Sequence, residues 1–238
     1  MPDQFSRTRM LLGDAAIEKL KCSRVILFGV GGVGSFAAEA LARAGIGRIE
    51  LVDNDVVGIT NLNRQLVALH STLGRKKVDV MQERINDINP DAVITAHDVF
   101  LSSETAALFS FHTYDYVLDA IDTVSAKLIL ADLCQKTGTP LVSSMGTGNK
   151  LDPTQLYVTD IYKTSGDPLA RIMRRELKKA GITKLKVVCS KEEPRKPVSG
   201  LEETTSRRST PASISFVPPA AGMILAGECV KDLLRGII

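Results

Sequence analysis

The chain has 238 residues, of which 44% are hydrophobic, 24% charged and 5% aromatic, a composition that excludes disordered, collagen-like and disulfide-rich proteins. The net charge is only +3, and the long uncharged stretch at residues 209–227 contains three prolines and several polar residues, so it does not fit a membrane-spanning helix. The N-terminus lacks the basic start and apolar run of a signal peptide. We therefore expect a cytoplasmic protein.

The first 150 residues alternate between strand and helix patterns. Short apolar runs at residues 23–29, 48–53, 92–97, 115–120 and 140–144 predict buried strands. Between them, residues 35–44, 78–88 and 123–137 predict helices, which end before Gly45, Pro90 and Gly138. This alternation predicts an α/β fold with a doubly wound, mainly parallel sheet.

The pattern changes after residue 150. Residues 155–161 and 184–189 predict strands, residues 168–180 a basic amphipathic helix, and residues 220–234 a last helix. Residues 191–211 are rich in Pro, Ser, Thr and charge without any periodicity, which predicts a mobile crossover loop. There is no internal repeat and no clean linker, so residues 1–238 are expected to form a single domain, with a core at about 20–150 and an antiparallel extension at 151–238.

A glycine-rich motif, Gly29-Val-Gly-Gly-Val-Gly34, follows the first predicted strand and opens the first predicted helix. Glycines let the backbone approach a phosphate closely, and the helix N-terminus offers free N–H groups. Asp53 closes the next strand, where a carboxylate can bind ribose hydroxyls. The pattern predicts a Rossmann-like nucleotide site formed by Gly29, Gly31, Gly32, Gly34 and Asp53. On its own it fits NAD as well as ATP.

Polar residues outside this motif distinguish the two nucleotides. Several follow the second strand and one ends the fourth: Asp55, Asn61, Arg64, Lys77 and Asp122. A dehydrogenase does not need a converging arginine, lysine and acid, whereas an enzyme that splits ATP between its α and β phosphates must neutralise charge and hold Mg²⁺. Taken singly, Arg64 also fits a surface ion pair, Lys77 an exposed helix face and Asp122 a helix cap. Together they favour ATP with Mg²⁺.

Basic residues are concentrated in one segment. Residues 163–196 hold eleven basic and four acidic residues, a net charge of +7, whereas the rest of the chain carries −4. This asymmetry suits a polyanionic partner, because each neutralised phosphate releases counterions. The alternative is a solvated, charged helix face. The candidate nucleic-acid-binding residues are Lys163, Arg171, Arg174, Arg175, Lys178, Lys179, Lys184 and Lys186.

These motifs resemble the adenylating superfamily that includes ubiquitin-activating enzymes and the bacterial activators of thiamine and molybdopterin sulfur carriers. The resemblance rests on the glycine motif, Asp53-x-Asp55, Asn61-x-Asn-Arg-Gln65, Lys77 and Asp119-x-x-Asp122. Further segments resemble the tRNA threonylcarbamoyladenosine dehydratase branch and extend the likeness over nearly the whole chain. They lie at residues 143–150, 161–165, 167–171, 184–188 and 216–222.

The resemblance implies ATP-dependent adenylation of the threonine carboxylate of N6-threonylcarbamoyladenosine in tRNA, followed by cyclisation with loss of one water. It implies that Asp53 holds the ribose, that Arg64 and Lys77 hold the phosphates, and that Asp122 holds magnesium. Arg7 matches an arginine that in relatives reaches into the ATP site of the partner subunit, which implies a homodimer. Sulfur-relay proteins are a further class of partner that the resemblance raises.

Two other functions remain open at this point. The first is adenylation of the C-terminal glycine of a ubiquitin-like sulfur carrier; many such enzymes carry zinc-binding C-x-x-C pairs, which the four cysteines here do not form. The second, an NAD-dependent oxidoreductase, is disfavoured by Arg64, Lys77 and Asp122. Cys189 lies near the loop where some relatives carry a reactive cysteine, and it is either such a thiol or an incidental strand residue.

Overall fold

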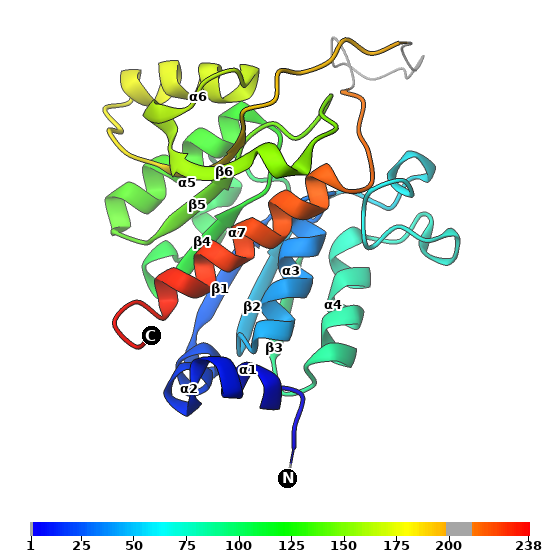
Figure 1. Cartoon of the computed structure of the whole chain (residues 1–238), viewed down its shortest axis with the longest axis vertical. Coiled ribbons are helices and arrows are strands. Elements are labelled where there is room, and N and C mark those ends of the chain that lie inside the picture. The colour runs from blue at the N-terminus through cyan, green and yellow to red at the C-terminus, as the bar shows by residue number, and fades with distance from the viewer. Residues whose placement is uncertain (1, 199–210) are drawn as a thin grey trace.

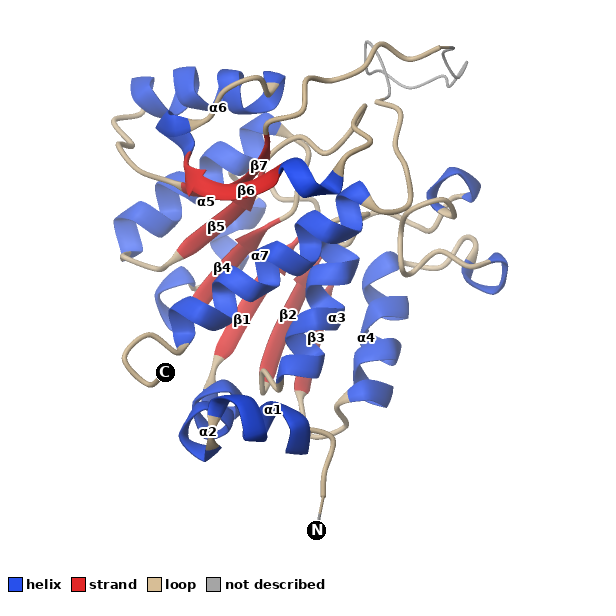
Figure 2. Ribbon diagram, viewed as in Figure 1, coloured by secondary structure: helices blue, strands red, loops and turns tan. Residues whose placement is uncertain are grey.

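The computed structural model describes residues 2–198 and 211–238. Within them, seven strands form one sheet in the order β3-β2-β1-β4-β5-β7-β6. The strands are β1 (Arg24–Phe28), β2 (Arg48–Val52), β3 (Val93–His97), β4 (Tyr116–Asp119), β5 (Leu141–Ser144), β6 (Leu156–Asp160) and β7 (Lys186–Ser190). Neighbouring strands are parallel except for the antiparallel pair β6–β7 (Figure 2). The predicted Rossmann-like fold with an antiparallel C-terminal extension is confirmed.

Helices cover both faces of the sheet (Figure 1). One layer contains α3 (Gly34–Ala44), α4 (Lys77–Ile88) and α7 (Val217–Leu233), and the other contains α5 (Val124–Thr137) and α6 (Pro168–Lys179). In β1, Val25 and Leu27 pack in the core with α3 and α7, whereas Ile26 and Phe28 pack in the core with α5. Burial on both faces explains why the central strands are continuous apolar runs in the sequence.

The predicted elements are present, with ends within two residues of those expected except at the start of α7. That helix begins at Val217 because Pro218 and Pro219 occupy its first turn, where a missing N–H costs nothing. Two short helices, α1 (Ser6–Leu12) and α2 (Asp14–Cys22), were not expected. The α1 helix buries none of its residues, so it lacks the apolar periodicity that signals a helix.

The crossover loop predicted at residues 191–211 lies largely outside the described residues. Its described residues, 191–198 and 211, contain neither helix nor strand. No helix in the part of the chain that the structure describes is both long and apolar enough to cross a membrane.

The carboxyl edge of the sheet brings together the segments that the sequence singled out. The glycine loop (residues 29–34) follows β1, Asp53 follows β2, residues 120–123 follow β4, and residues 145–150 follow β5. Between β1 and β4 the strand order reverses, and open α/β sheets bind ligands at the carboxyl side of such a switch point. The short helices α1 and α2 lie at the opposite, amino edge (Figure 1).

Candidate functional site

Some glycines of the glycine loop are closely packed against backbone atoms, and Gly31 has open space beside it. A Cβ atom on Gly34 would lie 1.8 Å from the Gly29 carbonyl oxygen, and one on Gly29 would lie 2.8 Å from the Ala120 carbonyl oxygen. The fold itself therefore requires both glycines. At Gly31, by contrast, the nearest atom would be Nε2 of Gln65 at 3.8 Å. This open side of the loop, next to the N-terminus of α3, suits a phosphate bound by backbone N–H groups.

Asp53 lies directly against the glycine loop. One carboxylate oxygen accepts a hydrogen bond from the Val30 N–H at 2.6 Å, and the other accepts one from the Asp55 N–H at 2.8 Å. Burial raises the pKa of Asp53, while the nearby Lys77 charge and these two hydrogen bonds oppose the shift. The carboxylate of Asp53 therefore joins the end of β2 to the glycine loop. The predicted phosphate contact, the glycine loop, and the predicted ribose contact, Asp53, thus lie side by side.

Lys77 is the first residue of α4 and is only 4% exposed. Its Nζ lies 2.7 Å from Oδ2 of Asp55, a residue with an exposed side chain. The alternative that Lys77 belongs to an exposed helix face is therefore wrong. Asp55, which was predicted to bind nucleotide, orients the ammonium group of Lys77 in this structure. A phosphate entering from the side of Asp55 would compete for the same ammonium group.

Arg64 and Asn61 lie in the segment between β2 and α4. The Nη1 of Arg64 donates hydrogen bonds to the Thr60 carbonyl oxygen at 3.0 Å and to Oδ1 of Asn63 at 2.9 Å. A Cβ on Gly32 would lie 3.3 and 3.4 Å from Cγ and Cδ of Arg64, so the arginine stem packs beside the glycine loop. Asn61 accepts a hydrogen bond at 3.0 Å from a backbone N–H three residues earlier and closes a turn in the same segment.

Asp122 lies in the turn after β4, three residues beyond the end of the strand. This corrects one expectation, because Asp119 and not Asp122 is the last residue of β4. Asp122 is exposed and accepts a hydrogen bond from Oγ1 of Thr123 at 3.2 Å; Thr123 is the N-cap residue of α5. The turn touches the glycine loop where Ala120 approaches Gly29. An exposed carboxylate in this position is of the type that holds Mg²⁺ together with phosphate oxygens.

Gln65 belongs to this edge although it was not selected as a site residue. It is 8% exposed, lies beside Gly31, and its Oε1 has no hydrogen-bond partner within the described structure. A buried acceptor without a partner is costly unless a ligand or water satisfies it. The orphaned oxygen and the open side of Gly31 both fit a ligand that enters the loop. The only sequence signal was its place next to Arg64 in the Asn61–Gln65 motif.

Lys127 is a second residue that sequence reasoning missed. Its side chain is fully buried, and Nζ donates to three oxygens at the ends of β4 and β5, those of the Asp119 carboxylate (3.0 Å), the Ser143 hydroxyl (3.2 Å) and the Ser144 carbonyl (2.7 Å). Asp119 also accepts a hydrogen bond from the Ile121 N–H at 3.1 Å. This network sets the turn that carries Asp122. A lysine on a helix resembles a surface residue in the sequence, so no pattern could have identified it.

Arg7 is placed far from the glycine loop of its own chain. It is exposed on α1, at the amino edge of the sheet (Figure 1). The structure therefore does not bring Arg7 together with the other predicted site residues of the same chain.

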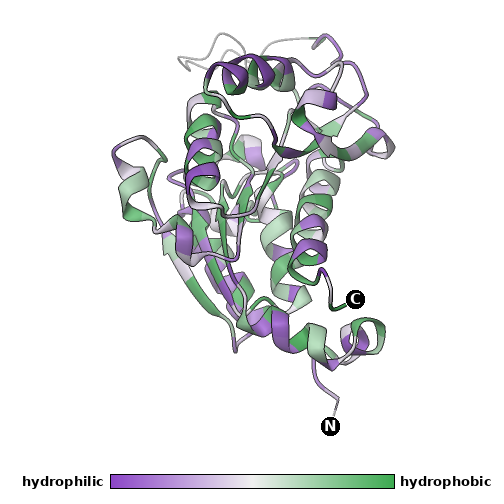
Figure 3. Ribbon diagram, turned by 90° about the vertical axis from the view of Figure 1, so that its left-hand side faces the viewer, coloured by the Kyte–Doolittle hydropathy of each residue, from purple (hydrophilic) through white to green (hydrophobic). Residues whose placement is uncertain are grey.

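The α6 helix presents basic side chains to the solvent. Its apolar residues Ala170, Met173 and Leu177 are buried. The ribbon of α6 is otherwise coloured largely as hydrophilic (Figure 3). Arg174 donates to the Thr164 carbonyl oxygen at 3.0 Å, so it is tied to the preceding loop. The exposed basic residues, called the α6 basic surface below, are Lys163, Arg171, Arg175, Lys178, Lys179 and Lys184.

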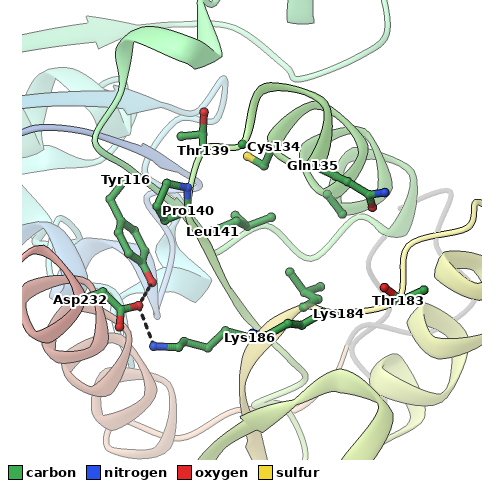
Figure 4. Close-up of a pocket in the computed structure, with 13 residues that line it drawn as sticks. Tyr116, Cys134, Gln135, Thr139, Pro140, Leu141, Thr183, Lys184, Lys186 and Asp232 are labelled. Atoms are coloured by element: carbon green, nitrogen blue, oxygen red, sulfur yellow. Dashed lines mark hydrogen bonds and ion pairs between the residues drawn. The ribbon is translucent and has the colours of Figure 1, made fainter. Parts of the chain in front are cut away.

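Lys186 does not share this surface. It lines a cavity of about 460 Å³ (Figure 4). The cavity also contacts Tyr116 and Leu141, the first residues of β4 and β5, so it lies at the amino edge of the sheet. Its Nζ lies 2.6 Å from Asp232 and 3.1 Å from Glu228, and the Tyr116 hydroxyl donates to the same Asp232 oxygen at 2.6 Å. Two carboxylates neutralise this lysine, so the expectation that Lys186 binds nucleic acid has to be corrected.

Cys189 is a buried residue of β7, only 1% exposed. Burial raises the pKa of its thiol, whereas reactive cysteines are accessible and have a lowered pKa. The structure favours the incidental strand residue over a reactive thiol.

We expect alkylation of the native chain at neutral pH to modify Cys22, which is exposed, and to leave Cys189 unmodified. The raised pKa keeps the Cys189 thiol protonated, and burial blocks the reagent. Peptide mass spectrometry after a timed reaction provides the measurement, and alkylation in denaturant is the control in which both thiols react. Equal labelling of Cys189 and Cys22 in the native chain would contradict the assignment.

A family model, related proteins and solved structures each match this chain over nearly its whole length. The model of the ThiF family matches residues 5–236. The tRNA threonylcarbamoyladenosine dehydratase of Bacillus subtilis (strain 168) is 49% identical over 247 residues, covering 100% of this chain and 97% of that protein. The crystal structure of E. coli tRNA N6-threonylcarbamoyladenosine dehydratase, TcdA, in complex with AMP is 37% identical with a TM-score of 0.90, covering 98% of this chain and 94% of that one.

The structure of the same E. coli protein in complex with ATP is 36% identical to this chain, with a TM-score of 0.88. The family match, the identity to the Bacillus subtilis protein and the shared fold all extend over the core and the C-terminal extension. The chain belongs to the ThiF family.

Proposed function

We propose that this chain is an ATP-dependent tRNA threonylcarbamoyladenosine dehydratase. The observation that carries the proposal is the 49% identity, over its whole length, to a Bacillus subtilis protein of that name. The geometry supports the nucleotide half of the reaction. Arg64 and buried Lys77 supply positive charge near a glycine loop that is open at Gly31.

The proposed reaction has two steps. An oxygen of the threonine carboxylate attacks the α-phosphorus of ATP, a new P–O bond forms, and pyrophosphate leaves. The carbamoyl group on the same side chain then closes on the activated carbonyl carbon and gives up a proton, and AMP leaves with the carboxylate oxygen. The product is lighter by one water. Because the nucleophile of the second step is intramolecular, proximity supplies much of its rate, and no enzyme thiol is needed.

The predicted ribose, phosphate and metal contacts have separate roles in the first step. Asp53 would bind the ribose, and backbone N–H groups of the glycine loop would bind phosphate oxygens. Arg64 and Lys77 would stabilise the charge that develops on the pyrophosphate and on the α-phosphoryl oxygens. Asp122 would hold Mg²⁺, which neutralises phosphate charge when bound.

The α6 basic surface is the proposed contact for tRNA. Its six side chains are exposed, and four of them, Arg171, Arg175, Lys178 and Lys179, lie on α6, whose other face is buried. This arrangement suits phosphate contacts along an RNA arm. Lys186 and Arg174 are left out because their side chains are engaged within the protein.

Charge reversal on the α6 basic surface should weaken the binding of tRNA whatever the tRNA sequence. It should also make the binding constant depend less steeply on salt concentration. In Arg171→Glu/Lys178→Glu we expect the slope of log K against log salt to fall by about two, one for each lost phosphate contact. A matched control, Lys21→Glu/Lys136→Glu, reverses two exposed lysines at the amino edge and should leave the slope unchanged. Filter binding at several salt concentrations measures both. If the two double variants behave alike, the surface is only a solvated helix face.

We propose a homodimer in which α1 of one subunit lies beside the ATP site of the other. Met10 and Leu11, close to Arg7 on α1, are 87% and 82% exposed, and Ile59 and Leu69 are exposed in the segment that carries Arg64. Apolar side chains gathered on an exposed surface favour a protein partner. Such a contact would bring Arg7 near the phosphates bound by the partner subunit.

The remaining proposals concern organisation and setting. Residues 1–238 would act as one adenylating domain, since β7 of the extension pairs directly with β5 of the core. The cytoplasm, where tRNA is modified, is the proposed compartment. Sulfur-relay proteins stay a class of partner implied by the family resemblance alone.

Pyrophosphate release separates this proposal from activation of a sulfur carrier. The chain would be incubated with ATP and Mg²⁺ plus modified tRNA, unmodified tRNA or a ubiquitin-like carrier with a C-terminal glycine. We expect release with modified tRNA alone. Release with the carrier, and none with either tRNA, would replace the proposal by the carrier function.

A further inference from the structure

The segment that leads into α7, residues 211–216, is hydrogen-bonded to the turn that follows β5. The backbone N–H of Asn149 donates to the Ala212 carbonyl oxygen at 2.7 Å, and the Ala212 N–H donates to Oδ1 of Asn149 at 2.8 Å. The Asn149 carbonyl oxygen accepts a further hydrogen bond at 2.8 Å from the Arg195 N–H. Asn149 thereby binds the backbone at Arg195 and at Ala212, both of which are far from Asn149 in the sequence.

Asn149 adopts a backbone conformation that most residues avoid. Its φ is +60°, and no other non-glycine residue in the described ranges has a positive φ. Asparagine tolerates this left-handed region better than most side chains, and such conformations persist where the surrounding structure enforces them. The neighbouring residue, Gly148, packs closely against Pro211, since a Cβ on Gly148 would lie 2.7 Å from Cβ of Pro211.

The hydrogen bonds continue from Ala212 to the guanidinium of Arg64. The next residue, Ser213, accepts a hydrogen bond through its carbonyl oxygen from Nδ2 of Asn63 at 3.1 Å. The other end of the same amide, Oδ1 of Asn63, accepts the hydrogen bond from Nη1 of Arg64 at 2.9 Å. Both ends of the Asn63 side chain are therefore hydrogen-bonded, Nδ2 to the segment at residues 211–216 and Oδ1 to Arg64.

We propose that Asn149 and Asn63 are positioning residues that hold the guanidinium of Arg64 over the glycine loop. This inference rests on the proposed function, in which Arg64 stabilises phosphate charge. Fixing an arginine side chain costs rotamer freedom, and a donor that is already oriented needs no reorganisation when charge develops. The turn after β5, which the sequence singled out at residues 143–150 without a role, thus acts on the ATP site through residues 212–213.

Two substitutions at Asn149 separate the hydrogen bond from the backbone. Asn149→Gly permits the positive φ without strain and removes only the Oδ1 acceptor. We expect it to lower the turnover of AMP formation about three- to tenfold, the effect expected from the loss of one hydrogen bond. Asn149→Asp keeps the acceptor and the tolerance for this φ, so it should recover most of the loss. Thermal unfolding of both variants should match that of the parent.

A double-mutant cycle with Arg64→Ala distinguishes positioning from a general structural role. If Asn149 acts through Arg64, adding Asn149→Gly to Arg64→Ala should cause no further loss of turnover. The same three- to tenfold loss in both backgrounds, or no loss in the parent background, would overturn the inference while the proposed role of Arg64 stands. If Arg64→Ala itself keeps the parent turnover, the phosphate role fails first and the positioning role fails with it.

Discussion

Replacing Arg64 with alanine should lower the turnover of AMP formation about 100- to 1,000-fold, the usual cost of removing one electrostatic contact to a transition state. The side chain packs its stem against Gly32 and is fixed by hydrogen bonds to Thr60 and Asn63. Charge on the phosphates grows as the α–β bond breaks, so the loss should appear at saturating ATP and not only in the KM.

Two companion variants make this result specific. Arg64→Lys keeps the charge but not the planar set of donors, so it should recover only part of the activity. Arg43→Ala removes an exposed arginine from the last turn of α3, away from the glycine loop, and should leave turnover unchanged. Near-normal turnover of Arg64→Ala at saturating ATP would show that the assignment is wrong.

Asp122→Asn should abolish AMP formation and leave the fold intact. The exposed side chain lies in the turn that touches the glycine loop, and asparagine keeps its shape but loses the negative charge that Mg²⁺ requires. Calorimetric titration of ATP gives a readout that does not depend on turnover. The parent should bind ATP more tightly with Mg²⁺ than without it, and the variant should show little difference.

Asp132→Asn is the matched control, since it neutralises a carboxylate of α5 that pairs with Lys136 away from the loop. It should keep both activity and the Mg²⁺ effect. Unchanged AMP formation in Asp122→Asn would instead support a structural role for Asp122 at the start of α5.

Local patterns predicted the architecture and much of the site, because strands, helices and the glycine loop are encoded by neighbouring residues. Gly34 illustrates this, since it is required by the close approach of the Gly29 carbonyl oxygen in the same loop. Asp122 was predicted to end the fourth strand but lies three residues beyond it. An apolar run does not show at which residue a strand ends. Helix α1 was missed since it buries none of its own residues.

Features that depend on distant partners could not be predicted. Lys186 counted as part of a basic segment, yet its partners Glu228 and Asp232 come from α7, more than forty residues later. Lys127 looked like a surface lysine until the fold placed Asp119 and Ser143 around it. For both lysines the partners come from other elements of the chain, and an ion pair depends on which elements the sheet brings side by side.

The most direct test of the account is the mass of the modified nucleoside itself. The chain would be incubated with ATP, Mg²⁺ and tRNA that carries or lacks threonylcarbamoyladenosine, and the nucleosides would be analysed by mass spectrometry after mild digestion. The account predicts that threonylcarbamoyladenosine loses one water, only when ATP is present, while tRNA without the modification is unchanged. An unaltered mass of the modified nucleoside, under conditions in which the chain forms AMP with another substrate, would contradict it.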